Sequence, residues 1–294
     1  MLSEGANLAD YKLVFLEQLQ RVARELTGAV ATKSGDWVVK GFIDVYRRVY
    51  ALTGDTKVVS KVLELLLYPK MAEFAAATGH KLVLSGEQNH YPDLSFVRDD
   101  GVKFAIDMKT TYRTHGDRVN GMTLGAFTGY FRDRASNKNV TFPYGEYSGH
   151  YVLGVIYSKA ADVALVPTVH DLADLSRIGS VIKDFEFFAQ PKYRIASSRP
   201  GSGNTKNIGS VTLREQLVHG TGPFADLGER VFDDYWMFYL ARDMARAAEL
   251  PNPPYTDLVS YARYRCNCPD LDEELAARLQ EIDTGPADVP EGEG

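Results

Sequence analysis

Hydrophobic residues recur along the chain at two alternating spacings, one typical of helices and one typical of strands. Helical spacing predicts helices over residues 8–28, 56–78 and roughly 227–248, with Pro69 expected to kink the second. Residues 197–210 are too rich in glycine and polar side chains for either regular element. Strand-like composition is found in residues 37–52 (a hairpin), 150–158 and 185–196. This order predicts one domain of mixed α/β class with an appended tail.

The stretch EQNHYPDLSFVRDDGVKFAIDMKTTY, from Glu87 to Tyr112, predicts an antiparallel β-hairpin. Its turn is Asp99-Asp100-Gly101, in which the glycine can adopt a positive φ. Arg98 then pairs with Val102, and counting outwards places Asp93 opposite Asp107. Side chains alternate between the two faces of a strand, so the even-numbered positions form one apolar face. That face consists of Leu94, Phe96, Val102, Phe104, Ile106 and Met108.

The other face of this hairpin carries Asp93, Asp107 and Lys109. Carboxylates that face each other across a ladder repel, so this pair favours a cation between them. Two carboxylates and a backbone carbonyl, for which Met108 is the candidate, suit Mg²⁺, and Lys109 could orient water or stabilise phosphoryl charge. Asp-x-Lys alone is weak evidence, because Asp55-Thr56-Lys57 has the same spacing. A surface ion-pair ladder therefore remains the alternative.

Two further segments contain residues of uncertain role. Glu64 lies in a strongly apolar helical stretch. It would either add a carboxylate to the metal site or lie on the solvent-exposed edge of the helix. The stretch PGSGNTKNIGS lacks the Gly-Lys-Ser/Thr of a nucleotide-binding loop and the spacing of a dinucleotide-binding loop. Its amide and threonine side chains would suit contacts in the DNA major groove, and a flexible surface loop is the alternative.

Charge is distributed unevenly along the chain. The 294 residues carry a formal net charge of −6, yet the segment from Asp270 to the end contributes −8, which leaves +2 for residues 1–269. Net charge therefore neither requires nor excludes DNA as a partner. We expect residues 270–294 to form an acidic, disordered tail. Neither a membrane span nor a secretory signal is expected, and Cys266 and Cys268 are typical of reduced thiols, so the expected location is cytoplasmic.

Several blocks resemble those of type II restriction endonucleases of the EcoRV kind, within the PD-(D/E)xK nuclease superfamily. The resemblance covers roughly residues 36–265, and its most specific parts are the glycine loop and the QNHYPD stretch. The matching blocks are GDTKVVSKVLEL (54–65), QNHYPDLSF (88–96), AIDMKTTY (105–112), TLGAFTGYFR (123–132) and GSGNTKNIGS (201–210).

This resemblance implies a restriction-endonuclease-like fold, with a central mixed β-sheet flanked by helices. It also implies a homodimer that embraces double-stranded DNA. It implies Mg²⁺-dependent cleavage, with Mn²⁺ as a possible substitute, in a cell that holds a cognate DNA methyltransferase. The catalytic positions match Asp93, Asp107 and Lys109, and Glu64 matches the family's helix glutamate. Residues 1–55 would form the dimerisation subdomain, and residues 56–269 the catalytic and DNA-binding subdomain.

The resemblance also implies DNA contacts. Glu87, Gln88 and Asn89 match the minor-groove loop, and Gly201, Ser202, Gly203, Asn204, Thr205, Lys206 and Asn207 match the loop that recognises outer base pairs. Thr56, Thr111, Thr123 and Lys138 match segments that contact DNA. Glu87 departs from the family's first glutamine, and Met108 replaces a branched aliphatic residue.

The expected activity is therefore cleavage of DNA at a palindromic hexanucleotide, GATATC, leaving blunt ends with 5′-phosphates. Two alternatives are a structure-specific repair nuclease of the same superfamily and a non-catalytic DNA-binding protein. The full acidic set with Lys109 argues against the binder, and the glycine loop against the repair nuclease.

Overall fold

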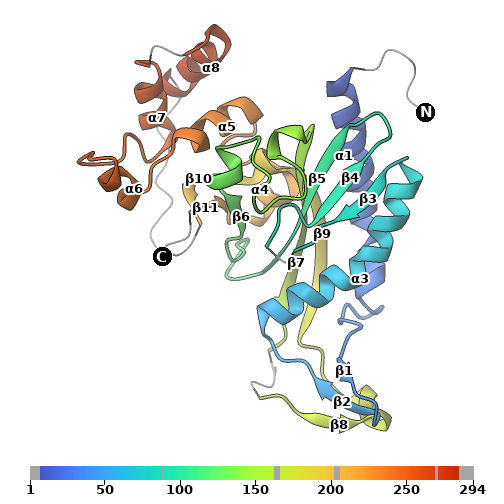
Figure 1. The fold of residues 1–294 in the computed structure, drawn as a ribbon. Coiled ribbons are helices and arrows are strands. Elements are labelled where there is room, and N and C mark those ends of the chain that lie inside the picture. Colours follow the sequence, from blue (N-terminus) through green and yellow to red (C-terminus); the bar gives the residue numbers. More distant parts are fainter. Residues whose placement is uncertain (1–6, 88, 162–165, 202–205, 269–270, 285–294) are drawn as a thin grey trace.

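A five-stranded mixed sheet forms the centre of the molecule (Figure 1). The computed structural model describes residues 7–87, 89–161, 166–201, 206–268 and 271–284. The strands follow the order β3-β4-β5-β7-β9, in which β5 and β7 are parallel and the other neighbours antiparallel. The predicted central mixed sheet is thereby confirmed. Its strands are β3 (Lys81–Leu84), β4 (Leu94–Val97), β5 (Lys103–Tyr112), β7 (Gly149–Lys159) and β9 (Ile182–Pro191).

Two long helices cover one face of this sheet. They are α1 (Leu8–Glu25), which short α2 (Thr27–Val30) follows, and α3 (Thr56–Ala77), which continues through Pro69. Asn7 and Asp55 cap the first turns of α1 and α3 by accepting backbone N–H bonds. The apolar face of the hairpin packs here, and the ring of Phe15 stacks on that of Phe104 with centroids 4.2 Å apart. Burial of these rings supplies most of the attraction between helices and sheet.

A second core covers the opposite face of the sheet. It is built on a small sheet of order β10-β11-β6 and on the helices after it. The elements are β6 (Thr123–Ala126), β10 (Ala196–Pro200), β11 (Asn207–Ser210), α4 (Arg214–His219), α5 (Glu229–Phe238), α6 (Arg242–Ala247), α7 (Leu258–Arg265) and α8 (Glu273–Thr284). Short 3₁₀ turns connect elements at η1 (Gly129–Phe131), η2 (Tyr144–Glu146), η3 (Leu172–Arg177) and η4 (Lys192–Ile195).

A third sheet, of order β1-β2-β8, lies at the end of the molecule away from α5–α8 (Figure 1). Strands β1 (Gly41–Ile43) and β2 (Arg48–Ala51) form the hairpin predicted within residues 37–52, and β8 (Val169–Asp171) adds to β2. Several apolar side chains of this sheet and its turn are exposed to solvent. They are Phe42, Ile43, Val45, Tyr46, Tyr50 and Val169.

Three element predictions were wrong in detail. The helix expected over residues 227–248 is divided into α5 and α6, because Tyr239 is extended and accepts a hydrogen bond from Arg132 on its carbonyl. The extended segment 185–196 ends at Pro191, and η4 follows. The segment 197–210 contains strand residues at both ends, because β11 pairs with both β6 and β10. Contacts with residues distant in sequence override weak local propensity in the first and third cases.

The expectation of a wholly disordered tail over residues 270–294 was also wrong. Helix α8 packs on the second core through Leu275 and Leu279, which are four residues apart and buried. Arg230 of α5 forms ion pairs with Asp272 and Glu274, so part of the acidic charge is neutralised. Residues 285–294 lie outside the described part of the chain. None of the helices in the described ranges is long and apolar enough to cross a membrane.

Candidate active site

The predicted register of the hairpin is confirmed. Leu94 pairs with Ile106 and Val97 with Lys103, and the backbone N–H of Arg98 donates to the carbonyl of Val102. This register places Asp93, which directly precedes β4, opposite Asp107. Ala105 packs into the second core, so the odd-numbered positions of β5 face the side of the sheet that carries β6, β10 and β11. The carboxylates and Lys109 are therefore directed away from α1 and α3.

Asp93 is held in place by the backbone of the neighbouring strand. The N–H of Met108 donates to its Oδ2 over 2.7 Å, at the point where the β4–β5 ladder ends. Within a strand the N–H and C=O of one residue point to the same neighbour, so the Met108 carbonyl faces the same edge. Burial and the adjacent carboxylate of Asp107 raise the pKa of Asp93 to about 7, against the pull of Lys109.

Lys109 supplies the positive charge of the site. Its Nζ lies 2.6 Å from Oδ2 of Asp107, and both side chains are largely buried. Burial opposes the charged form of Lys109, but Asp107 and Asp93 together keep its pKa above the ordinary value. The ammonium group is therefore held on the carboxylate face in its charged form.

The donor set of this site fits a divalent metal ion. Asp93 and Asp107 place two carboxylates side by side, and the carbonyl of Met108 faces the same edge. Hard oxygen donors of this kind suit Mg²⁺ or Mn²⁺. A dication would also relieve the repulsion that raises the pKa of Asp93.

Glu64 does not join the two carboxylates in the structure. Its side chain pairs with Lys61 over 2.6 Å on α3. Nowhere in the described ranges do three or more His, Cys, Asp or Glu side chains gather in a group that could hold a metal. The charge of Asp93 still acts on Lys61, so the Lys61–Glu64 pair lies within electrostatic reach of the site. A metal-binding role for Glu64 stays a prediction.

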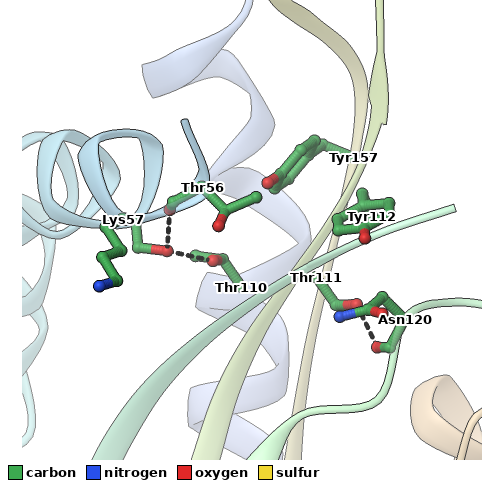
Figure 2. Close-up of a pocket in the computed structure, with 8 residues that line it drawn as sticks. Thr56, Lys57, Thr110, Thr111, Tyr112, Asn120 and Tyr157 are labelled. Atoms are coloured by element: carbon green, nitrogen blue, oxygen red, sulfur yellow. Dashed lines mark hydrogen bonds between the residues drawn. The ribbon is translucent and has the colours of Figure 1, made fainter. Parts of the chain in front are cut away.

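A cavity of about 260 Å³ separates the start of α3 from β5 (Figure 2). Thr56 and Lys57 line one side, and Thr110 to Tyr112 line the other. The hydroxyl of Thr111 is buried and donates to the carbonyl of Asn120, so it is engaged within the protein. Two DNA contacts implied by the resemblance, Thr56 and Thr111, therefore lie at one cavity, with only Thr56 exposed.

The two described ends of the glycine loop adjoin β10 and β11, and β11 pairs with β6. The N–H of Gly201 donates to the carbonyl of Asn207, which closes the loop at its base. A Cβ on Gly201 would lie 3.0 Å from Cγ2 of Thr123, so these two predicted DNA-binding positions are adjacent. Lys206 pairs with Asp243 over 3.5 Å between exposed side chains. Ser202, Gly203, Asn204 and Thr205 lie outside the described residues.

The remaining predicted contacts lie on exposed loops. Glu87 and Asn89 are exposed between β3 and β4, close in sequence to Asp93, and the carbonyl of Glu87 accepts the N–H of His90. Lys138 is exposed in the segment after η1, and its N–H donates to Ser136. Gln88 lies outside the described residues. No contact in the described structure joins these loops to the carboxylates.

Two comparisons with known proteins identify the family of the chain. The family model described as restriction endonuclease EcoRV matches residues 33–266. The type II restriction enzyme EcoRV of Escherichia coli is 31% identical over 243 residues, which cover 82% of this chain and 96% of that enzyme. The chain belongs to the EcoRV restriction endonuclease family. It is therefore a DNA-cleaving endonuclease, and endonucleases of this family use divalent metal ions.

One buried charge near this EcoRV-family site was missed by the sequence analysis. Lys192 follows Pro191 directly and is 2% exposed. The signal was available, because Lys192 is a charged residue in the apolar stretch FEFFAQPKYRIA, just as Glu64 stands among leucines.

Proposed function

We propose that this chain hydrolyses both strands of DNA at a short palindromic site with Mg²⁺, and that Mn²⁺ can substitute. The observation that carries the proposal is the assembly of Asp93, Asp107 and Lys109 on one face of a hairpin in correct register. Asp93, Asp107 and the carbonyl of Met108 would hold the ion, with Glu64 as a further carboxylate nearby. The ion would supply Lewis acidity and a water of lowered pKa.

Lys109 acts directly on the phosphate in this proposal. Asp107 fixes its ammonium group, which keeps a proton donor on the face that the DNA would approach. There it orients the attacking water or stabilises charge on the phosphoryl oxygens. In-line attack at phosphorus then leaves 5′-phosphate and 3′-hydroxyl ends.

Recognition of GATATC, with cleavage to blunt ends, is the finer part of the proposal. The loop from Gly201 to Asn207 would contact outer base pairs in the major groove, and Glu87 to Asn89 the minor groove. Thr123, which lies beside Gly201, supports this arrangement by placing a predicted DNA-binding position next to the loop. Lys206 and Lys138 would contact DNA phosphates. The cavity lined by Thr56 and Lys57 would give the sugar–phosphate backbone of the DNA a further contact.

A palindromic site implies a protein with a two-fold axis, and we propose a homodimer. The exposed apolar side chains of the β1-β2-β8 sheet support this proposal, because Val45 and Tyr46 are 89% and 77% exposed. Exposed apolar side chains gathered on one small sheet and its turn favour a protein partner. Sedimentation of the native chain against a Val45→Asp, Tyr46→Asp variant tests the assignment. The native protein should sediment as a dimer and the variant as a monomer, whereas an equally monomeric native protein would contradict it.

Digestion of one plasmid of known sequence with Mg²⁺ tests the cleavage itself. Discrete fragments whose run-off sequences end bluntly at the centre of GATATC are expected. Staggered ends, or a site without an outer G·C pair, would contradict the specificity but not the chemistry. Cutting only at unusual DNA structures would indicate a repair nuclease, and binding without cutting a non-catalytic protein. We further propose that the enzyme acts in the cytoplasm beside a methyltransferase that protects the same site.

A further inference from the structure

Lys192 is a buried cation that the proposed chemistry does not use. It lies in η4, directly after β9, with 2% of its surface exposed. Its Nζ finds no hydrogen-bond partner among the residues that the structure describes. An ammonium group taken out of water without a partner is costly, so its burial calls for a reason beyond packing. Lys109, by contrast, has a carboxylate 2.6 Å away.

Aromatic rings surround the ammonium group of Lys192. The centroids of Tyr91, Phe131 and Tyr144 lie 5.2, 5.6 and 5.5 Å from its Nζ, within the range of cation–π attraction. Tyr91 stands two residues before Asp93, and its ring stacks on that of Tyr130. These rings therefore connect Lys192 to the segment that carries the first carboxylate.

The same ammonium group approaches the hydroxyl of Tyr130 at Gly125 of β6. A Cβ built there would lie 3.1 Å from Oη of Tyr130 and 3.4 Å from Nζ of Lys192, so both groups converge on this glycine. Burial, followed by the charge of Asp107, raises the pKa of Tyr130 to about 12. Burial lowers the pKa of Lys192 to about 8, and Asp107 opposes that shift.

We propose that Lys192 is a positioning residue that sets the metal affinity of the Asp93–Asp107 pair. The inference rests on the metal site of the proposed function. Asp93, Asp107 and Lys109 together leave one uncompensated negative charge in a poorly solvated site. Lys192 compensates this charge, since Asp107 favours its charged form, and its ammonium group lies among aromatic rings rather than on the carboxylate oxygens. A nearby fixed positive charge repels a dication about twice as strongly as a proton. Lys192 therefore weakens metal binding even where protons compete for the carboxylates.

The test is calorimetric titration of the free protein with Mn²⁺ at pH 7.5, using Lys192→Met, which keeps the length and apolar packing of the side chain. Mn²⁺ should bind at least about tenfold more tightly to this variant than to the native protein. Lys192→Arg, which keeps the charge, should stay near the native affinity. Lys70→Met, which removes an exposed lysine paired with Glu73 on α3, controls for net charge and should change nothing.

Thermal unfolding without metal gives a second readout. With EDTA at pH 8, Lys192→Met should be less stable than the native protein and Lys192→Arg should not, because only the neutral variant leaves the charge of the carboxylate pair uncompensated. Stability of Lys192→Met equal to or above that of the native protein would contradict the compensation. If that variant does not fold, Lys192→Gln serves the same titration.

Mn²⁺ affinity of the neutral variant within twofold of native would overturn the inference and leave the metal site intact. Failure of the native protein to bind Mn²⁺ would instead contradict the proposed metal site, and with it the inference about Lys192.

Discussion

The Asp93 carboxylate accepts the backbone N–H of Met108 over 2.7 Å, at the end of the ladder between β4 and β5. A side chain thus occupies the place where the next residue of β4 would have bonded to β5. This contact holds Asp93 beside Asp107. The two carboxylates therefore repel each other in a site that little water reaches. Several properties of the protein should depend on it.

Ionisation of Asp93 should destabilise the metal-free protein. Its folded-state pKa of about 7 lies above the ordinary value of 3.8, so the stability that its proton provides is present at low pH and lost between about pH 4 and 7. Asp93→Asn keeps an acceptor for Met108 and cannot ionise. With EDTA present, it should be more stable than the native protein at pH 8 by up to about 4 kcal/mol, and the difference should shrink at pH 5. Chemical unfolding at both values measures this, and an equal difference at both would exclude Asp93 as the cause.

The same ionisation should govern cleavage. A protonated Asp93 cannot hold a metal ion, so the cleavage rate should fall as the pH drops below about 7 at fixed, subsaturating Mg²⁺. Raising the Mg²⁺ concentration should move the acidic limb to lower pH, because metal and proton compete for one carboxylate. Single-turnover cleavage rates across pH 5.5–8.5 check this. An acidic limb whose midpoint does not move with the Mg²⁺ concentration would mean that another group causes the pH dependence.

Lys109→Ala should reduce cleavage by about a thousandfold or more, because it removes a charge placed for the transition state. Asp107→Ala should cost at least as much, since it removes a metal ligand and leaves Lys109 without its partner. Binding of DNA with Ca²⁺ should survive better in Lys109→Ala. Lys103→Ala on the same strand, which loses its pair with Glu146 and its contact with the ring of Phe142 but touches neither carboxylate, is the matched control. Cleavage within tenfold of native in either site variant would defeat the assignment.

Glu87→Gln should alter DNA binding more than the position of cleavage. Glu87 is exposed in the loop before Asp93. In the proposed complex this loop enters the minor groove, where the carboxylate of Glu87 would repel the DNA phosphates. The neutral variant should bind with higher affinity at low salt, and the difference should narrow as salt screens the charge. Binding isotherms across a salt series measure this effect. Identical isotherms at every salt concentration would show that Glu87 lies away from the DNA.

Gly154→Ala should destabilise the sheet beside the site by about 1–3 kcal/mol. Gly154 pairs with Lys109 across β5 and β7, and a Cβ there would lie 2.0 Å from Cζ of Phe188. Phe188→Leu in the same chain should recover part of the loss, because it frees the space that the methyl group needs. Unfolding free energies of the two single variants and the double variant measure the coupling. Simple additivity would mean that the ring does not restrict this position.

The sequence alone determined the hairpin, its register and the face that carries Asp93, Asp107 and Lys109, because strand alternation and a glycine turn are local properties. It also determined the DNA-cleaving family, since the motif blocks keep their order along the chain.

Other features were decided only by the tertiary structure. The break at Tyr239, the pairing of β10 with β11 and the packing of Leu279 in the acidic tail each depend on partners distant in sequence. Lys192 shows the same limit, because its rings come from three separate segments of the chain. Burial and charge compensation are sums over neighbours in space, which local periodicity does not record.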